Sequence, residues 1–275
     1  MNALDFFFRD YETRLTSSIF VTEGKAGKFL AEDPLLEYTP SQQFREAQLM
    51  TAKVSGKSIG TNFWRLLTQL RSESGVAVLP NLQMGGGGRN NAAVSGAVVV
   101  NGERMLVRLG SRDTESLLLL RNRYENGVIN VGCPAGTKKE KKGKDIFEVV
   151  RADTSIRVQV SEAKTEFFVD VDLEGGVGEL QCSDVTDPDW EREFADRTAR
   201  EIERALLETI DLLQRHKADA LGIGNMIYAK QPRLWKKLKK DWGERFAAAT
   251  AHVHVDVAVD STGMTIGKST SRKGG

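Results

Sequence analysis

Two short alternating segments followed by one long amphipathic segment constrain the fold of this chain more than any other feature. In residues 156–160 and 167–173 apolar and polar side chains alternate, which is the pattern of half-buried strands. Asp187-Pro188 then opens a segment to His216 whose apolar side chains recur mostly every four residues, which predicts an amphipathic helix about 40 Å long. Its apolar stripe comprises Trp190, Phe194, Thr198, Ile202, Leu206, Ile210 and Leu213. The strands need such a helix to cover their apolar face, so an α+β architecture is predicted here.

The end of the chain extends this unit. Glycines within 219–224 interrupt the long helix, and Pro232 opens another helix with an apolar face. Residues 252–260 follow as a strand in which valines alternate with other residues. We therefore expect residues 151–275 to form a C-terminal α+β domain, an antiparallel sheet packed by the long helix. The tryptophans expected in its core are Trp190, Trp235 and Trp242.

Four consecutive glycines divide the rest of the sequence. Glycines cannot contribute to a core, so residues 85–91 are predicted to be a Gly-rich linker. Before it, residues 1–84 have the pattern of a partial N-terminal α+β domain. After it, residues 92–150 have the pattern of a small middle α+β domain, with a turn at Asn101-Gly102 that is typical of a β-hairpin. The whole chain is thus predicted to be a multidomain α+β protein with antiparallel or mixed sheets covered by helices.

Composition and charge exclude several classes of protein. The chain has 39 basic and 38 acidic residues, so its net charge of +1 creates no general field that would attract nucleic acid. The sequence contains no run of about 18 apolar residues that would span a bilayer. Its first residues lack the basic start and long apolar run of a signal peptide. We expect neither a nucleic-acid partner nor a membrane-spanning segment.

The two cysteines, Cys133 and Cys182, are too few and too far apart for a zinc site. They leave two alternatives, a single disulfide or a pair of buried thiols, and we favour the buried thiols.

Two rows of polar residues lie on predicted strands, and neither row is expected to bind a metal or take part in catalysis. Alternate side chains on a strand lie nearly 7 Å apart, so a solvated sheet face is expected in place of a metal site in the first row. That row comprises His252, His254 and Asp256. The second row alternates with buried residues and is expected to face water, and it comprises Asp170, Asp172 and Glu174. Motifs for nucleophiles and phosphate loops are also absent from the sequence. We predict no catalytic, metal or cofactor-binding residue, and no enzymatic activity.

A basic stretch in the helix after Pro232 is the one candidate interaction surface. Its residues lie opposite the tryptophans, so a solvated face is the simplest interpretation, and attraction to anionic lipid is the functional one. The lysine-rich loop 138–144 would add to such a surface. The predicted patch facing a membrane or a partner comprises Arg233, Lys236, Lys237, Lys239 and Lys240.

The block from Lys217 to Trp242 resembles a known family. In this block Asp219 precedes a Gly-x-Gly turn, and a Pro-x-x-Trp basic helix follows and ends in tryptophan. The block is similar to the C-terminal signature of the Ger(x)C spore germination proteins. Weaker similarities to the first and middle domains of that family lie in residues 4–10, 20–26 and 94–99. The resemblance therefore runs in order over almost the whole chain.

The resemblance implies a non-catalytic C subunit of a spore nutrient germinant receptor, with three α+β domains and no cofactor. Such subunits are lipid-anchored at the extracytoplasmic face of the spore inner membrane and assemble there with two integral-membrane subunits, A and B. The signal peptide, the lipid-bearing cysteine and the first strands of the family have no counterpart in this sequence. We therefore expect a fragment, a sequence with a misassigned start or a soluble form.

One alternative belongs to a different functional class, a soluble module that itself binds and senses a small nutrient. The sequence shows no convergent cluster of polar residues for a small molecule, so we favour the receptor subunit.

Overall fold

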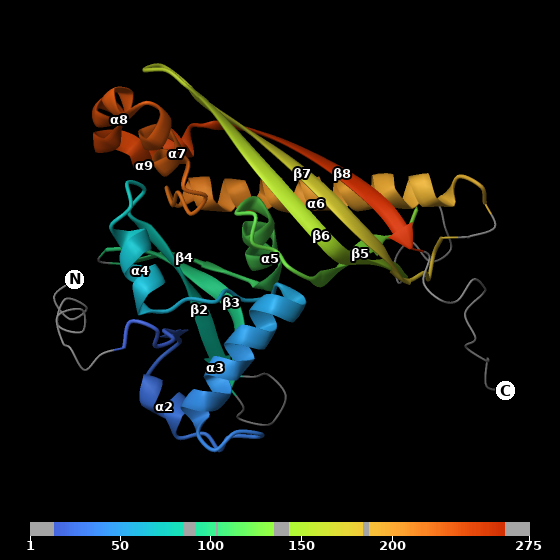
Figure 1. The fold of residues 1–275 in the computed structure, drawn as a ribbon, viewed down its shortest axis with the longest axis horizontal. Coiled ribbons are helices and arrows are strands. Elements are labelled where there is room, and N and C mark those ends of the chain that lie inside the picture. The colour runs from blue at the N-terminus through green and yellow to red at the C-terminus, as the bar shows by residue number, and fades with distance from the viewer. Residues whose placement is uncertain (1–13, 85–91, 103, 135–142, 184–186, 262–275) are drawn as a thin grey trace.

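The computed structural model describes residues 14–84, 92–102, 104–134, 143–183 and 187–261. Two four-stranded sheets with their covering helices make up these residues, in the strand orders β1-β2-β3-β4 and β5-β6-β7-β8 (Figure 1). The predicted α+β architecture is therefore confirmed. Four features of the sequence lie outside the described residues: the similarity in residues 4–10, the linker 85–91, most of the lysine-rich loop 138–144 and the residues after 261.

The first sheet uses residues from both sides of the predicted linker. Its strands are β1 (Val21–Thr22), β2 (Val76–Met84), β3 (Ala92–Asn101) and β4 (Arg104–Leu109). β1 is parallel to β2, and the other pairs are antiparallel. The predicted hairpin turn is present, because Asn101 pairs with Arg104. Met84 pairs with Ala92, so the segment 85–91 connects two neighbouring strands of one sheet.

Helices cover both faces of this sheet. The helices before β2 are α2 (Ala26–Leu30), α3 (Pro40–Met50), the π-helical η1 (Thr51–Ser55) and α4 (Phe63–Leu70), and α5 (Ser111–Leu120) follows β4. Val78 of β2 packs in the same core as α5, whereas Ala77 and Leu79 pack with Leu66 of α4 on the other face. This burial on two sides explains why β2 lacks the alternating pattern of a half-exposed strand.

The second sheet has one strand in an unexpected direction. Its strands are β5 (Gly127–Gly132), β6 (Lys144–Val160), β7 (Thr165–Glu179) and β8 (Thr250–Ser261). β5, β6 and β7 pair antiparallel, but β8 is parallel to β7, with Val255 beside Val171. The expectation of a purely antiparallel C-terminal sheet is wrong at this strand. A long helix carries the chain back along the sheet, so β8 starts at the same end as β7 (Figure 1).

β6 is a single strand of 17 residues and passes through the predicted domain boundary between residues 150 and 151. One hydrophobic core contains residues from both sides of that boundary, among them Phe147 and Phe167. The same core contains residues of α5, so it extends from the first sheet to the second.

The long helix α6 (Trp190–Arg215) confirms the predicted helix and its stripe. Every residue of the stripe from Phe194 to Leu213 is buried, and Trp190 is half-buried. After α6 the chain forms α7 (Ile223–Lys230), α8 (Pro232–Leu238), the short η2 (Lys239–Asp241) and α9 (Trp242–Ala247). Within the described ranges, none of the helices combines the length and apolarity that crossing a bilayer requires.

Candidate functional site

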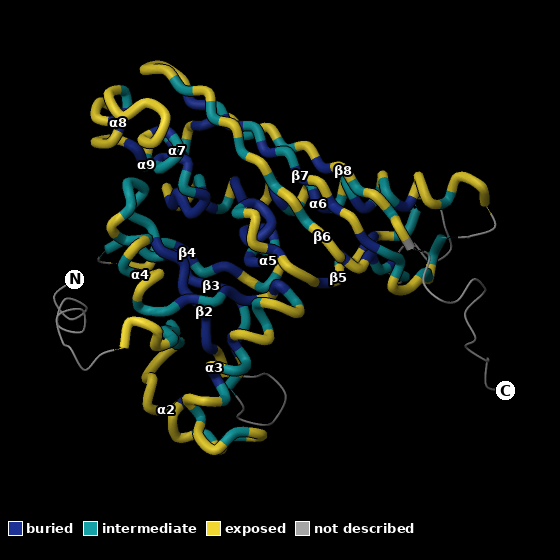
Figure 2. The backbone as a smooth tube through the Cα atoms, in the orientation of Figure 1, coloured by how far each residue is buried: buried dark blue, intermediate teal, exposed yellow. Residues whose placement is uncertain are grey.

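The predicted basic patch lies on α8 and η2, and all five of its residues are exposed (Figure 2). Two of them have acidic partners, because Lys237 Nζ lies 2.6 Å from Glu162 Oε1 and Lys239 Nζ lies 2.8 Å from Glu73 Oε2. The other three form no ion pair with any described residue, and they are Arg233, Lys236 and Lys240. The free positive charge of the patch is therefore smaller than its composition suggests.

Beneath this patch the signature block is organised around the carboxylate of Asp219, which is 2% exposed. Its two oxygens accept five hydrogen bonds of 2.8–2.9 Å, from the backbone N–H groups of Gly222, Ile223 and Gly224, the indole N–H of Trp242 and the hydroxyl of Ser74. Asp219 with these donors is called the Asp219 hub below. A carboxylate that is buried away from water must be compensated by hydrogen-bond donors. Because these donors include the backbone at the start of α7 and the Trp242 side chain of α9, the hub holds the two helices together.

The two glycines of the Gly-x-Gly turn have different roles in this packing. Gly222 has a φ of 79°, a left-handed conformation that is unfavourable for residues other than glycine. A Cβ atom on Gly224 would lie 2.6 Å from Cη2 of Trp235 and 2.9 Å from Nε1 of Trp242. The turn therefore requires glycine once for conformation and once for space.

The tryptophans of the signature block lie in the core, as predicted. Trp235 is 1% exposed and Trp242 is 6% exposed. Their ring centroids are 5.1 Å apart and the rings meet edge to face, a favourable geometry for aromatic pairs. The signature of this block is thus largely a packing signature.

The turn between α4 and β2 docks on this packed block. The indole N–H of Trp235 donates to Glu73 Oε2 at 2.6 Å, and the backbone N–H of Ser74 donates to Asn225 Oδ1 at 2.9 Å. The hydrogen bonds from Lys239 and from Trp235 lower the pKa of Glu73 from its ordinary value. Sequence reasoning missed Glu73 and Ser74, because no local pattern marks a contact between residues 145 positions apart.

Five of the six residues in the polar rows on the second sheet are exposed, as expected, and Asp170 is the exception. His252 and His254 have side chains that are 48% and 66% exposed, and the His252 ring stacks on Phe168 with centroids 4.6 Å apart. In the acidic row Asp170 is half-buried and pairs with Arg157 at 2.9 Å. Asp172 and Glu174, the other two members of that row, are exposed.

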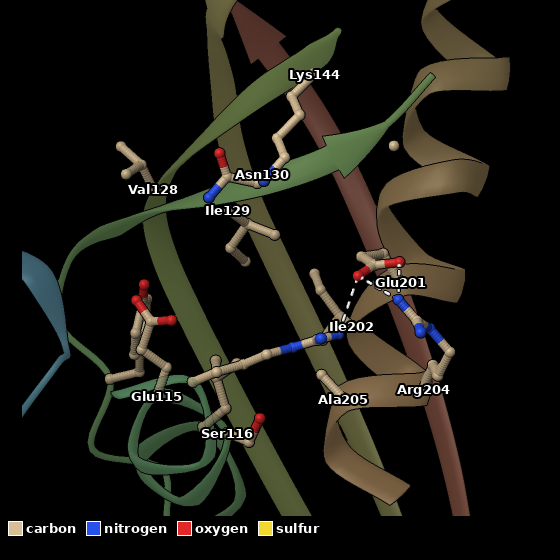
Figure 3. Close-up of a pocket in the computed structure, with 14 residues that line it drawn as sticks. Glu115, Ser116, Val128, Ile129, Asn130, Lys144, Glu201, Ile202, Arg204 and Ala205 are labelled. Atoms are coloured by element: carbon tan, nitrogen blue, oxygen red, sulfur yellow. Dashed lines mark hydrogen bonds and ion pairs between the residues drawn. The ribbon is translucent and has the colours of Figure 1, made fainter. Parts of the chain in front are cut away.

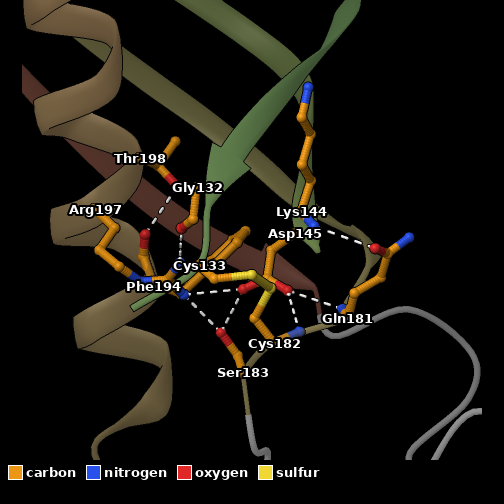
Figure 4. A network of polar contacts seen from close by, with 10 residues as sticks. All are labelled: Gly132, Cys133, Lys144, Asp145, Gln181, Cys182, Ser183, Phe194, Arg197 and Thr198. Atoms are coloured by element: carbon orange, nitrogen blue, oxygen red, sulfur yellow. Dashed lines mark hydrogen bonds and ion pairs between the residues drawn. A yellow bond between two sulfur atoms is a disulfide. The ribbon is translucent and has the colours of Figure 1, made fainter. Parts of the chain in front are cut away.

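The two cysteines form a disulfide, which corrects the prediction of two buried thiols (Figure 4). Cys133 follows β5 and Cys182 follows β7, and the β5–β6–β7 arrangement brings their Cα atoms to 5.4 Å. The two residues are 49 positions apart in the sequence, so only the sheet topology reveals their proximity.

A buried ion pair adjoins this disulfide (Figure 4). Asp145 is completely buried, and its Oδ2 lies 3.0 Å from Nη2 of Arg197 on α6. Burial opposes ionisation of Asp145, but hydrogen bonds from Ser183, the Cys182 N–H, Arg197 and the Gln181 N–H together lower its pKa. The disulfide joins the ends of β5 and β7, and the ion pair attaches this end of the sheet to α6.

We expect replacement of both cysteines by serine to lower the free energy of unfolding by about 2–4 kcal/mol. The disulfide closes a long loop and so restricts the unfolded chain. Urea denaturation with and without reductant measures this loss, and reductant should leave the doubly substituted protein unchanged. Equal stability of the two proteins under oxidising conditions would contradict the expectation.

A cavity of about 380 Å³ lies between α5, β5 and α6. Figure 3 shows Glu115 of α5 on one side of it and Glu201 and Arg204 of α6 on the other. Burial raises the pKa of Glu115 to about 7, although the charges of Lys57 and Arg112 act in the opposite direction. The sequence analysis found no such polar cluster, because its members come from separate elements.

Two family models match the chain in order. The model described as "Spore germination protein N-terminal domain" matches residues 1–84, and "Spore germination B3/GerAC like, C-terminal" matches residues 95–263. The chain belongs to the GerAC-like family of spore germination proteins. The resemblance to Ger(x)C proteins in the sequence is therefore confirmed.

The sequence identity between this chain and individual spore germination proteins is low. The chain is 26% identical over 268 residues to spore germination protein YndF of Bacillus subtilis (strain 168), covering 94% of this chain and 63% of YndF. It is 22% identical over 260 residues to spore germination protein KC of the same strain, covering 88% of this chain and 63% of that protein. The chain thus spans less than two thirds of the length of these relatives.

A solved GerAC-like structure shares the fold. The crystal structure of the GerBC protein superposes with a TM-score of 0.71 at 18% identity, covering 94% of this chain and 73% of that chain. The signature block therefore belongs to a chain whose fold is shared with a solved structure. The Asp219 hub explains in structural terms why the block contains its aspartate and Trp242.

Proposed function

We propose that this chain acts as the non-catalytic C subunit of a spore nutrient germinant receptor. The observation that carries the proposal is that both GerAC-like family models match the chain in order. The inferred partners are the integral-membrane A and B subunits of the same receptor, and the inferred site of action is the extracytoplasmic face of the spore inner membrane. The contribution of the chain is protein–protein assembly.

The use of the signature block in packing supports a non-catalytic role. Asp219 accepts hydrogen bonds from within the chain, and Trp235 and Trp242 are buried. These side chains stabilise α7–α9 and present no nucleophile or base to a substrate.

The disulfide supports a location outside the cytosol. Disulfides persist in oxidising compartments, whereas the cytosol keeps most thiols reduced. The Cys133–Cys182 bond therefore agrees with the proposed extracytoplasmic face.

The exposed basic residues of α8 and η2 support contact with the membrane surface. Each basic residue near an anionic bilayer contributes about 1 kcal/mol of attraction. Arg233, Lys236 and Lys240 have no acidic partner among the described residues, so their charge is available for such contact.

Nutrient-triggered germination tests the assignment. The host spores would carry the A and B subunits of the same receptor but lack the native C subunit. We expect this chain, joined to a leader with a lipid-bearing cysteine, to restore the response and to co-purify with both partners. The unanchored chain should restore it poorly, because tethering raises the effective concentration at the membrane.

A second arm of the experiment tests the patch. Charge reversal to glutamate at Arg233, Lys236 and Lys240 should weaken the response of the anchored chain. The matched control reverses three exposed basic residues at and near α2 and α3, which are Lys25, Lys28 and Arg45. No response from the anchored chain would reject the assignment, and equal responses from the two reversed variants would reject membrane contact through the basic patch.

A further inference from the structure

The cavity between α5, β5 and α6 has the properties of a binding site for a small molecule. Its volume of about 380 Å³ lies in the range of ligand pockets. Apolar walls are formed by Leu119, Val128, Ile129, Ile202 and Ala205. Polar groups lie at separate places on this apolar surface, which is the usual composition of a pocket that orients a ligand.

One side of the cavity contains two polar groups without partners. Tyr124 is 5% exposed, and its hydroxyl has no hydrogen-bond partner among the described residues. The same holds for the buried Oε1 of Glu115. The two groups are close enough that the charge of Glu115 contributes to raising the pKa of Tyr124, after the larger effect of burial. A buried polar group without a partner is costly, and both the carboxylate oxygen of Glu115 and the hydroxyl oxygen of Tyr124 can accept a hydrogen bond, so this side can bind a ligand that donates.

The other side of the cavity has an excess of positive charge. Glu201 lies between two guanidinium groups, 3.0 Å from Nη2 of Arg112 and 2.6 Å from Nη2 of Arg204. Lys144 also lines the cavity. Glu208 does not line the cavity, but its Oε1 lies 3.6 Å from Nη1 of Arg204. Even when Glu208 is counted with Glu201, the three basic residues Arg112, Arg204 and Lys144 outnumber the two acidic ones. This side favours a ligand with an anionic group.

We propose that this cavity binds a small zwitterion whose ammonium and carboxylate groups are separated by an apolar chain. The ammonium would donate to Glu115 and Tyr124, the carboxylate would contact Arg112, Arg204 and Lys144, and the apolar walls would surround the chain. A simple cation would leave the basic side unmatched, and a simple anion would leave the buried oxygen of Glu115 without a donor. The opposite positions of Glu115 and Arg204 favour separated charges over adjacent ones (Figure 3). This site goes beyond the receptor-subunit proposal and does not depend on receptor assembly.

Calorimetric titration of the isolated chain with four six-carbon compounds tests the proposal. ε-Aminocaproate has separated charges, norleucine has adjacent charges, and caproate and hexylamine each carry one charge. We expect saturable binding of ε-aminocaproate and at least about tenfold weaker binding of the other three. At pH 7 the ligand ammonium should lower the pKa of Glu115 and release protons, so the binding heat should depend on the ionisation enthalpy of the buffer.

Two variants and a control locate the binding. Glu115→Gln should weaken binding about tenfold or more and remove the dependence on buffer. Ala205→Phe should abolish binding by filling the cavity, with thermal melts reporting that each variant is folded. Glu193→Gln alters an exposed carboxyl near the start of α6 and should leave binding unchanged. The proposal is overturned by no saturable binding of ε-aminocaproate, by equal binding of caproate, hexylamine or norleucine, or by binding that either Glu115→Gln or Ala205→Phe leaves unaltered. None of these outcomes bears on germination by the anchored chain.

Discussion

Replacing Asp219 by asparagine should lower the free energy of unfolding by about 3–5 kcal/mol. The substitution keeps the shape of the side chain but replaces one acceptor oxygen with an NH₂ group. Each Asp219 oxygen accepts at least two N–H bonds, so that NH₂ would face donors whichever way the amide turned. Buried donors without an acceptor each cost free energy, and the charge that stabilised them is lost as well. Urea denaturation followed by circular dichroism measures the loss.

Asp211→Asn provides the matched control for this experiment. Asp211 lies on α6, is 66% exposed and pairs with Arg215 at 3.0 Å. An exposed pair of this kind contributes little, so the control should lose no more than about 0.5 kcal/mol. A loss of less than about 1 kcal/mol in Asp219→Asn, below the range for a buried polar network, would mean that the Asp219 hub does not stabilise the fold.

Trp235→Ala should cost about 3–5 kcal/mol of unfolding free energy, the usual range for emptying a large core site. The indole is 1% exposed, packs over Gly224 and meets the Trp242 ring edge to face. Its removal also leaves Glu73 with one hydrogen bond fewer. The measurement is again a urea melt at fixed pH.

Two further variants separate the contributions of Trp235. Trp235→Phe keeps much of the packing but loses the hydrogen bond to Glu73. Its free energy of unfolding should therefore lie between those of the wild type and Trp235→Ala. Trp64→Ala removes a tryptophan that is 58% exposed and should change stability by about 0.5 kcal/mol. If Trp235→Ala cost no more than Trp64→Ala, Trp235 would be a surface residue and a candidate for partner contact.

The elements with a regular period were predictable from the sequence. The α6 stripe and the alternating β7 strand are local patterns, because burial on one face determines which positions are apolar. The direction of β8 was not predictable, because its alternation is the same in a parallel or an antiparallel pair. The continuity of β6 was missed because it becomes exposed partway along its length and so changes its pattern.

The candidate sites were harder to predict than the fold. The basic patch on α8 and η2 could be located from the sequence, but the pairing of Lys239 with Glu73 could not. The disulfide, the Asp219–Ser74 contact and the cavity all join residues that are far apart in the chain. Such contacts depend on how the two sheets and α6 are arranged, and no local period encodes that arrangement.

The parallel position of β8 has a consequence for how the chain folds as it is made. Residues 180–249 separate β7 from β8, its parallel partner, and β8 is the last of the described elements to emerge during synthesis. Until β8 is made, one edge of β7 has no partner strand, and one side of α6 lacks the strand that it packs against. Pairing between distant segments is slow, because the intervening loop must first be closed. A growing chain that ends before β8 therefore cannot complete its core, and its apolar surface stays partly uncovered until β8 is made.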